Sequence, residues 1–281
     1  MIIVMQAHTT DDSIQAVVQF INQKGLKEHI SRGTERTIIG AMGDERVFDA
    51  AEIEQLPQVE RAINIVHEWR MVSKEAALQN TEITVRGVTF GGNTPIKHIG
   101  SLKTDDAILL DPFYLPSNPY LFSGCKTEKE ISNQISLHHQ NNQPVIIKIH
   151  DSKHIQATFN MQADMIYIGG DLVENRYVLH ELGSLNIPVI VCKHATHTVK
   201  DWLLAAEQIV LRGNQHVILG DAGTLNPTSE MLRLDVDATV AAKQLSHLPV
   251  LADIRLLAHR FMPQETLIQL ATIAGVDMIA K

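Results

Sequence analysis

The second half of the chain carries short apolar runs that recur at intervals of 20–37 residues. They are apolar on both faces, as parallel strands covered by helices are. The intervals are long enough for βα units, and amphipathic segments such as TVKDWLLAAEQIVLRGN supply outer helices. Seven consecutive runs predict a barrel of the TIM (β/α)8 type rather than an open sheet, and therefore an α/β protein. The runs are AILLD, PVIIKIH, DMIYIGG, PVIVCK, HVILGD, PVLAD and VDMIA.

The first 70 residues have a different pattern. An apolar run, IIVMQA, precedes a segment whose apolar residues follow helical spacing and which Gly25 ends. Two strand-like runs, LKEHIS and ERTIIGAM, come next, before a short helix near 50–57 and a last run, RAINIVHE. The order βαββαβ predicts a ferredoxin-like domain. The helical stripe consists of Ile14, Val17, Val18 and Ile21.

We therefore expect three segments: a ferredoxin-like domain over 1–70, a linker with a β-hairpin over 71–93, and a partial barrel over 94–281. Only SLKTDD separates PIKHIG from AILLD, which is too short for a crossover helix, and no helix follows VDMIA. A seven-stranded, partly open barrel exposes a sheet edge that another segment of the chain or a partner must cover. The sequence thus predicts an oligomer, either with itself or with a homologue.

Composition excludes several classes of protein. The 281 residues carry a net charge of −8 without a dense Lys/Arg block, which argues against nucleic-acid binding. No apolar run reaches the ~18 residues that a membrane span needs, and the N-terminus lacks the features of a signal peptide. Cys125 and Cys192 are far apart and lack CxxC spacing. They predict isolated reduced thiols in a cytoplasmic protein.

The N-terminal segments HISRGTERTIIGAMGDER, WRMVSKEA and TEITVRGVTFGG resemble the regulatory domain and linker of type I DAHP synthases. These enzymes condense phosphoenolpyruvate with erythrose 4-phosphate at the first step of the shikimate pathway, which leads to aromatic amino acids. In this branch of the family, aromatic amino acids bind between paired ferredoxin-like domains and inhibit the barrel. The resemblance implies that His29 and Ser31 contact such an effector. The alternative is that Ser31 and Gly33 only form a turn between strands.

The resemblance continues in the barrel. LLDPFYLPSNPYLFSG lies where the family has its substrate loop, and SHLPVLADIR covers the strand that ends in Asp-Pro-Ser-His. VIVCKHATHTVKDWLLAAEQI is similar to the family's Leu-Lys-Arg-Gly strand end, with Lys193 on the family lysine. Phosphoenolpyruvate needs several cations, because its carboxylate and phosphate must both be paired. Of the family's set, Lys193 is the one certain cation left. The other positions hold Leu115, Ser117 or Asn118, Asp171, His194 and Ala222.

The metal site that the resemblance implies is also altered. The family holds a divalent ion with Cys, His, Glu and Asp. PIKHIGSLKTDD replaces the cysteine's strand, Asp253 is followed by Ile254 and Arg255, and the Glu and Asp are expected beyond Lys281. We therefore predict no metal cofactor. His194 and His197 are close in sequence and are alternative ligands, but no carboxylate lies at a known distance from them.

These residues favour a DAHP synthase-like protein that is catalytically inactive and acts as a regulatory or ligand-sensing homologue. One alternative is an active, metal-dependent DAHP synthase, which requires at least three Arg or Lys side chains converging on one pocket. Another is a small-molecule lyase or aldolase at the barrel mouth, with Lys193 forming a Schiff base. The substrate-binding candidates are Lys193, His194, Asp221 and Asp253.

Overall fold

The computed structural model consists of two compact units, Met1–Leu78 and Gln79–Lys281. Residues 71–93, which the sequence suggests as linker and hairpin, are divided between the two units. No helix in the described part of the chain has the length and apolar character needed to cross a bilayer. The structure describes residues 1–32, 37–42, 49–63, 68–77, 79–116, 118, 120–121, 127–227 and 231–281.

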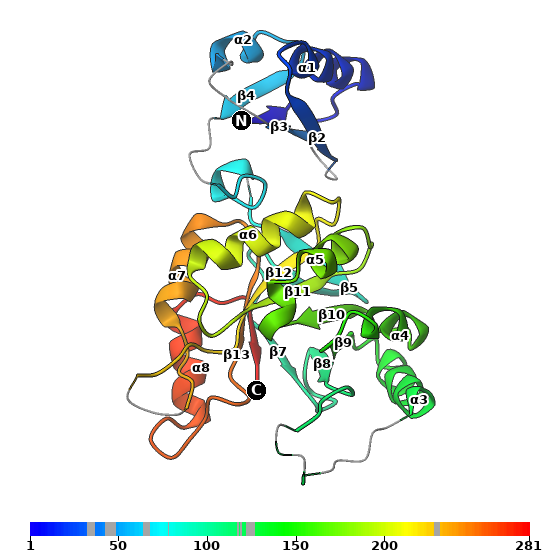
Figure 1. Cartoon of the computed structure of the whole chain (residues 1–281), viewed down its shortest axis with the longest axis vertical. Helices are drawn as coiled ribbons and strands as arrows, with labels where there is room; N and C mark the ends of the chain where they lie inside the picture. The colour runs from blue at the N-terminus through cyan, green and yellow to red at the C-terminus, as the bar shows by residue number, and fades with distance from the viewer. Residues whose placement is uncertain are drawn as a thin grey trace. The chain divides into compact units, whose positions relative to one another are not determined.

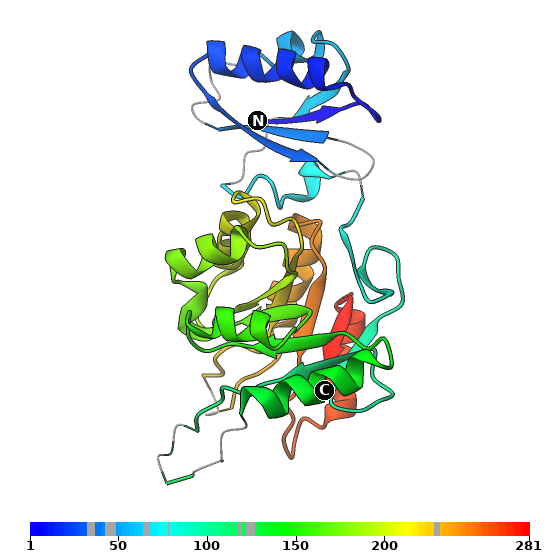
Figure 2. The same cartoon turned by 90° about the vertical axis from the view of Figure 1, so that its right-hand side faces the viewer.

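The first unit has the predicted βαββαβ order and is a ferredoxin-like domain. Its antiparallel sheet has the order β2-β3-β1-β4, and helices α1 and α2 lie on one face of it (Figure 2). The last strand begins two residues earlier than the RAINIVHE run predicts, because Val59 already pairs with Met5. The elements are β1 (Ile2–Met5), α1 (Asp11–Gln23), β2 (Lys27–Arg32), β3 (Thr37–Met42), α2 (Ala50–Glu54) and β4 (Val59–Ile63).

Local sequence explains how α1 begins and what it buries. The Thr10 hydroxyl accepts a hydrogen bond from Ser13 N, and two aspartates occupy the first turn, where the helix dipole favours negative charge. The predicted apolar stripe is buried against β1 and β3. On the sheet's other face, a Cβ at Gly40 would lie 3.1 Å from Met71 Sδ, so glycine allows this close approach.

The second unit is a closed barrel of eight parallel strands, in the order β10-β11-β12-β13-β14-β7-β8-β9 (Figure 1). The expectation of a seven-stranded, partly open barrel is wrong, because PIKHIG supplies β7, which pairs with both β14 and β8. The strands are β7 (Lys97–Gly100), β8 (Ala107–Leu110), β9 (Val145–Lys148), β10 (Met165–Ile168), β11 (Val189–Lys193), β12 (Val217–Asp221), β13 (Val250–Asp253) and β14 (Met278–Ala280).

The link between β7 and β8 contains no helix, as the sequence predicts, yet the two strands are parallel neighbours. They share only two residue pairs, so residues 101–106 need to carry the chain back only a short distance from the end of β7 to the start of β8. Asp105 Oδ2 accepts a hydrogen bond from Leu102 N and would lie 2.4 Å from a Cβ at Gly100. A tight turn beside a glycine therefore closes the ring, and the barrel edge from which association was predicted does not exist.

Six helices among the described residues follow barrel strands and lie outside the ring (Figure 1). Trp202 on α6 is fully buried, as expected for a core residue, and its Nε1 donates to Val191 O at 2.8 Å. The helices are α3 (Glu128–His139), α4 (His154–Asn160), α5 (Arg176–Gly183), α6 (Val199–Val210), α7 (Val236–Leu245) and α8 (Gln264–Ile273).

A hairpin of β5 (Glu82–Val85) and β6 (Val88–Gly91) closes the amino-terminal end of the barrel. Ile83 and Phe90 are fully buried and belong to the same apolar cluster as the residues that fill the barrel interior. At the hairpin turn, Arg86 Nε donates to Asp164 Oδ1 at 2.7 Å, just before β10. The functional site is therefore expected at the opposite, carboxyl-terminal end, where barrel enzymes place theirs.

Candidate functional site

Lys193 ends β11, and its side chain is completely buried. Its Nζ lies 3.0 Å from Asp235 Oδ2 and 3.7 Å from Asp221 Oδ1. Neither contact has the geometry of a hydrogen bond, so two ion pairs hold the ammonium. A buried ammonium that faces two carboxylates is neutralised within the chain and is not exposed to a carbonyl substrate.

Asp221 ends β12 and fixes the loop that follows. Its Oδ1 accepts a hydrogen bond from Gly223 N and its Oδ2 accepts one from Asp235 N, both at 3.0 Å. Asp235 in turn caps α7 through Ala238 N at 3.2 Å. Burial raises the pKa of Asp221, against the opposing effects of Lys193 and the two backbone N–H groups. Lys193, Asp221 and Asp235 thus form one structural cluster that joins β11, β12 and α7.

Asp253 ends β13, and Arg255 occupies both of its carboxylate oxygens. Arg255 Nε donates to Oδ1 at 2.8 Å and Nη2 donates to Oδ2 at 2.7 Å, a bidentate pair. Tyr167 on β10 donates to Oδ2 at 3.0 Å. Burial raises the pKa of Tyr167 well above its usual value, so its hydroxyl is a protonated donor. Because β10 and β13 are not neighbours in the ring, this hydrogen bond crosses the barrel interior.

A third charged group lies where β8 and β9 end. Asp111 Oδ1 accepts a hydrogen bond from His150 Nε2 at 2.7 Å, and Asp111 Oδ2 lies 3.9 Å from Lys148 Nζ. The same Nζ is 5.3 Å from the centroid of the Tyr167 ring, within the range of a cation–π contact. This group is partly exposed, with side chains between 22% and 35% accessible.

The strand ends therefore carry more cations than sequence reasoning counted. Lys148 and Arg255 were not included among the candidates, although each stands at or directly after a predicted strand end. Each of the three cations faces a carboxylate of the same chain. The partners of Lys148, Lys193 and Arg255 are Asp111, Asp221 with Asp235, and Asp253.

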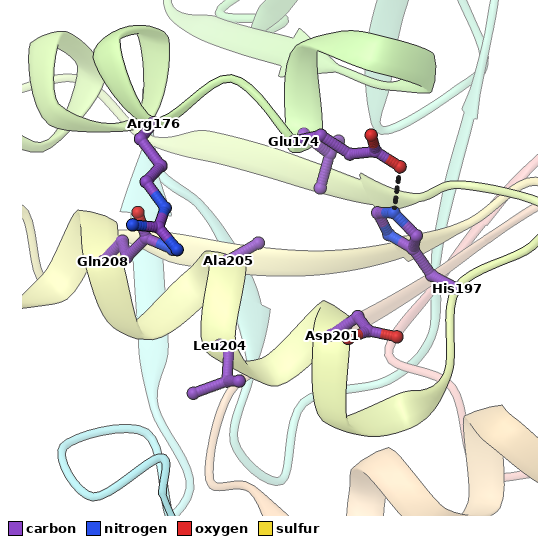
Figure 3. Close-up of a pocket in the computed structure, with 8 residues that line it drawn as sticks. Glu174, Arg176, His197, Asp201, Leu204, Ala205 and Gln208 are labelled. Carbon is purple, nitrogen blue, oxygen red and sulfur yellow. Dashed lines mark hydrogen bonds and ion pairs between the residues drawn. The ribbon is translucent and has the colours of Figure 1, made fainter.

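His194 lies apart from these clusters, on the turn after β11. Its Nδ1 contacts Thr196 Oγ1 at 2.7 Å, and its ring centroid is 5.4 Å from that of His197. His197 Nε2 is 2.8 Å from Glu174 Oε1, a residue that sequence reasoning missed because it follows a different strand. Figure 3 shows Glu174 and His197 directed toward one another beside a cavity of about 410 Å³.

The predicted effector residues lie on β2. His29 is half-buried, and burial lowers its pKa, which favours the neutral ring near pH 7. Its Nε2 is buried without a hydrogen-bond partner. Ser31 lies within β2, where its backbone pairs with Ile38 rather than forming the turn considered above. Gly33, Ser117 and Cys125 lie outside the described residues.

Burial raises the pKa of the Cys192 thiol to about 12. The thiolate, which is the reactive form, is therefore strongly disfavoured at pH 8. We expect iodoacetamide to leave Cys192 unmodified in the folded protein and to alkylate it in guanidinium chloride. Peptide mass spectrometry distinguishes Cys192 from Cys125. Equal alkylation of Cys192 in both conditions would show that β11 is not packed as described.

Comparison with known families identifies the chain. The profile of the DAHP synthase ferredoxin-like domain matches residues 1–67. The profile of the DAHP synthetase I family matches residues 109–265, more than half of the chain. The chain belongs to this family. Its members take part in aromatic amino acid biosynthesis, as the resemblance implied.

Relatives of known structure agree with the assignment to the DAHP synthase family. Phospho-2-dehydro-3-deoxyheptonate aldolase of Thermotoga maritima is 28% identical, and the match covers 90% of this chain and 80% of that protein. Its crystal structure superposes with a TM-score of 0.70 at 26% identity, over 99% of this chain and 86% of the other. A truncated form of 3-deoxy-D-arabino-heptulosonate 7-phosphate synthase from the same organism, at 22% identity and TM-score 0.65 over 75% and 83%, shares the fold.

The described residues do not fit the divalent ion that the DAHP synthase family implies. At β13 both oxygens of Asp253 are taken by Arg255, whose positive charge opposes a cation there. The end of β7 offers Gly100 and Ser101 in place of a thiolate. The one thiol among the described residues, Cys192, is buried in the barrel core. We therefore derive no catalytic step through that ion.

Proposed function

We propose that this DAHP synthase homologue has lost the synthase reaction and acts as a regulatory, ligand-sensing protein. The observation that carries the proposal is the internal pairing of the strand-end cations. The Lys193 side chain is fully buried and that of Arg255 is 24% exposed, and each faces carboxylates of its own chain. Cytoplasmic residence, expected from the isolated thiols, is part of the same proposal.

Electrostatics explains why such a mouth disfavours phosphoenolpyruvate. The substrate carries a carboxylate and a phosphate, and each requires cations that are free to pair with it. Four aspartates already face Lys148, Lys193 and Arg255, so an incoming anion meets no excess of positive charge. Breaking a buried pair to free one cation leaves an uncompensated carboxylate, which is strongly unfavourable.

The N-terminal domain supports a sensing role. The buried, unpartnered Nε2 of His29 is able to hydrogen-bond a polar group of a ligand placed against β2. β2 and β4 form the two edges of the sheet and leave backbone groups for pairing with another domain of this kind. We infer that association with a second copy or an active homologue uses this domain, and that the effector is an aromatic amino acid.

A thermal-shift titration tests the sensing role. Tyrosine or phenylalanine that binds only the folded chain stabilises it by about 2.7 kcal/mol at a hundredfold excess over Kd. We expect His29→Ala and Ser31→Ala together to abolish the shift. His8→Ala, which removes an exposed histidine of the same domain, should leave it unchanged. Absence of a shift at millimolar concentrations of either amino acid would count against a retained sensor.

One observation favours the alternative of an active synthase. Lys148, Lys193 and Arg255 are three cations at the same end of the barrel, the number that such an enzyme requires. An active enzyme would have to release at least two of them from their aspartates when substrate binds. Tight binding of phosphoenolpyruvate in calorimetry, lost in Arg255→Ala, would favour this alternative.

A further inference from the structure

Three side chains with metal-binding atoms meet beyond the carboxyl ends of β10 and β11. Glu174 follows a short 3-10 helix, η3 (Gly170–Val173), while His194 and His197 lie between β11 and α6. One ligand atom from each residue lies within 4.8 Å of the others. Among the residues that the structure describes, no other group of three His, Cys, Asp or Glu side chains gathers this closely.

The backbone places the two histidines on one side of a turn. His197 N donates to His194 O at 3.0 Å, which closes the turn, and the centroids of the two rings lie 5.4 Å apart. Thr198 then caps α6, and Asp201 completes that capping box by accepting from Thr198 N and Oγ1. Asp201 is thus committed to the helix end, although it lines the same cavity (Figure 3).

In each histidine ring, Nε2 is the nitrogen that would bind an ion, and Nδ1 is left for a second contact. His194 Nδ1 lies 2.7 Å from Thr196 Oγ1 and 3.3 Å from Thr196 N. When Nε2 is a ligand, Nδ1 carries the ring proton and donates it to Thr196 Oγ1, and the contact with Thr196 N is given up. His194 Nε2 is also 4.0 Å from Asp171 Oδ1, which is fully exposed and able to approach. Metal-binding histidines usually have such a second contact, which fixes the ring orientation. His197 Nδ1, in contrast, is buried without a hydrogen-bond partner.

We propose that Glu174, His194 and His197 bind a divalent transition-metal ion, for which Zn²⁺ is the best match. Two imidazoles and one carboxylate are a donor set that suits Zn²⁺, whereas Mg²⁺ and Ca²⁺ prefer oxygen ligands alone. Bonds of about 2.0–2.2 Å require the ligand atoms to move closer together than 4.8 Å. The His194 side chain is 30% exposed and is able to rotate, and Asp171 or water supplies a fourth ligand.

This ion differs in place and ligands from the one that the family implies, which would lie near β7 and β13. The proposal of this metal site also does not depend on the proposed loss of synthase activity. The site joins the loops that follow two adjacent strands, so a bound ion links these loops and stabilises the folded chain.

Equilibrium dialysis of the chain without a histidine tag, stripped of metal and titrated with Zn²⁺, tests the proposal. We expect one equivalent to bind and the melting temperature to rise. His194→Ala with His197→Ala should weaken binding at least tenfold, since loss of second contacts alone costs 10–100-fold. Glu174→Gln, which preserves the shape of the side chain, should also weaken binding at least tenfold. Co²⁺ in place of Zn²⁺ should give a visible spectrum that the same variants abolish.

The matched control is His150→Ala with His154→Ala, a second pair of neighbouring histidines, of which His150 contacts Asp111 instead. This variant should keep the Zn²⁺ affinity of the unmodified chain. The absence of stoichiometric binding would overturn the proposal. So would binding that survives in the His194 and His197 variant but is lost in the control, because the ion would then occupy another site.

Discussion

Replacing Lys193 with alanine is expected to lower the free energy of unfolding by about 3–5 kcal/mol, the usual cost of breaking a buried ion pair. The substitution leaves the buried Asp221 and the partly exposed Asp235 without their cation. Chemical denaturation followed by circular dichroism measures the loss. Lys153→Ala is the matched control, because its contact with Asp151 is exposed and is worth about 0–1 kcal/mol.

A double-mutant cycle separates the energy of the Lys193–Asp235 ion pair from the other effects of removing either side chain. If Lys193 is structural, Asp235→Ala should lower the free energy of unfolding less in the Lys193→Ala background than in the unmodified chain. Without Lys193, the negative charge of Asp235 no longer takes part in an ion pair. Additive losses, or a loss from Lys193→Ala below about 1 kcal/mol, would contradict the structural role of the lysine. The residue would then be free for a substrate.

Replacing Phe90 with alanine is expected to destabilise the protein by about 3–5 kcal/mol. Phe90 is fully buried where the β5–β6 hairpin closes the barrel, so the substitution leaves a cavity among interior residues. Thermal or chemical unfolding measures the effect. Phe261→Ala removes a ring that is 78% exposed and should cost about 1 kcal/mol or less. Similar losses for the two variants would mean that the hairpin does not seal the barrel.

Much of the fold was predictable because it depends on local patterns. The stripe from Ile14 to Ile21 and the alternating runs around it determine the βαββαβ domain, and doubly apolar runs determine parallel strands. The closure of the barrel was not predictable in the same way. A general minimum for crossover length left PIKHIG out of the count of barrel strands, but strands that share two residue pairs need less chain.

Within the site, only the residues at the ends of strands were predictable from the sequence. Lys193, Asp221 and Asp253 were placed at the barrel mouth because the resemblance aligns them with the ends of the family's strands, where apolar runs also end. Asp235 is 14 residues beyond β12 and reaches Lys193 only through the loop that Asp221 holds. Glu174 likewise meets His197 only because two neighbouring loops fold toward each other. Such contacts depend on tertiary structure and leave no periodic signal in the sequence.

The most direct test of the proposed loss of synthase activity is consumption of phosphoenolpyruvate with erythrose 4-phosphate in the presence of Mn²⁺. We predict no formation of the seven-carbon product above the rate without protein. Lys193 and Arg255 are paired internally, and the residues of this chain do not fit the metal ion that the family implies. An active DAHP synthase serves as the positive control. Metal-dependent turnover that disappears in Arg255→Ala, while that variant remains folded, would contradict the account.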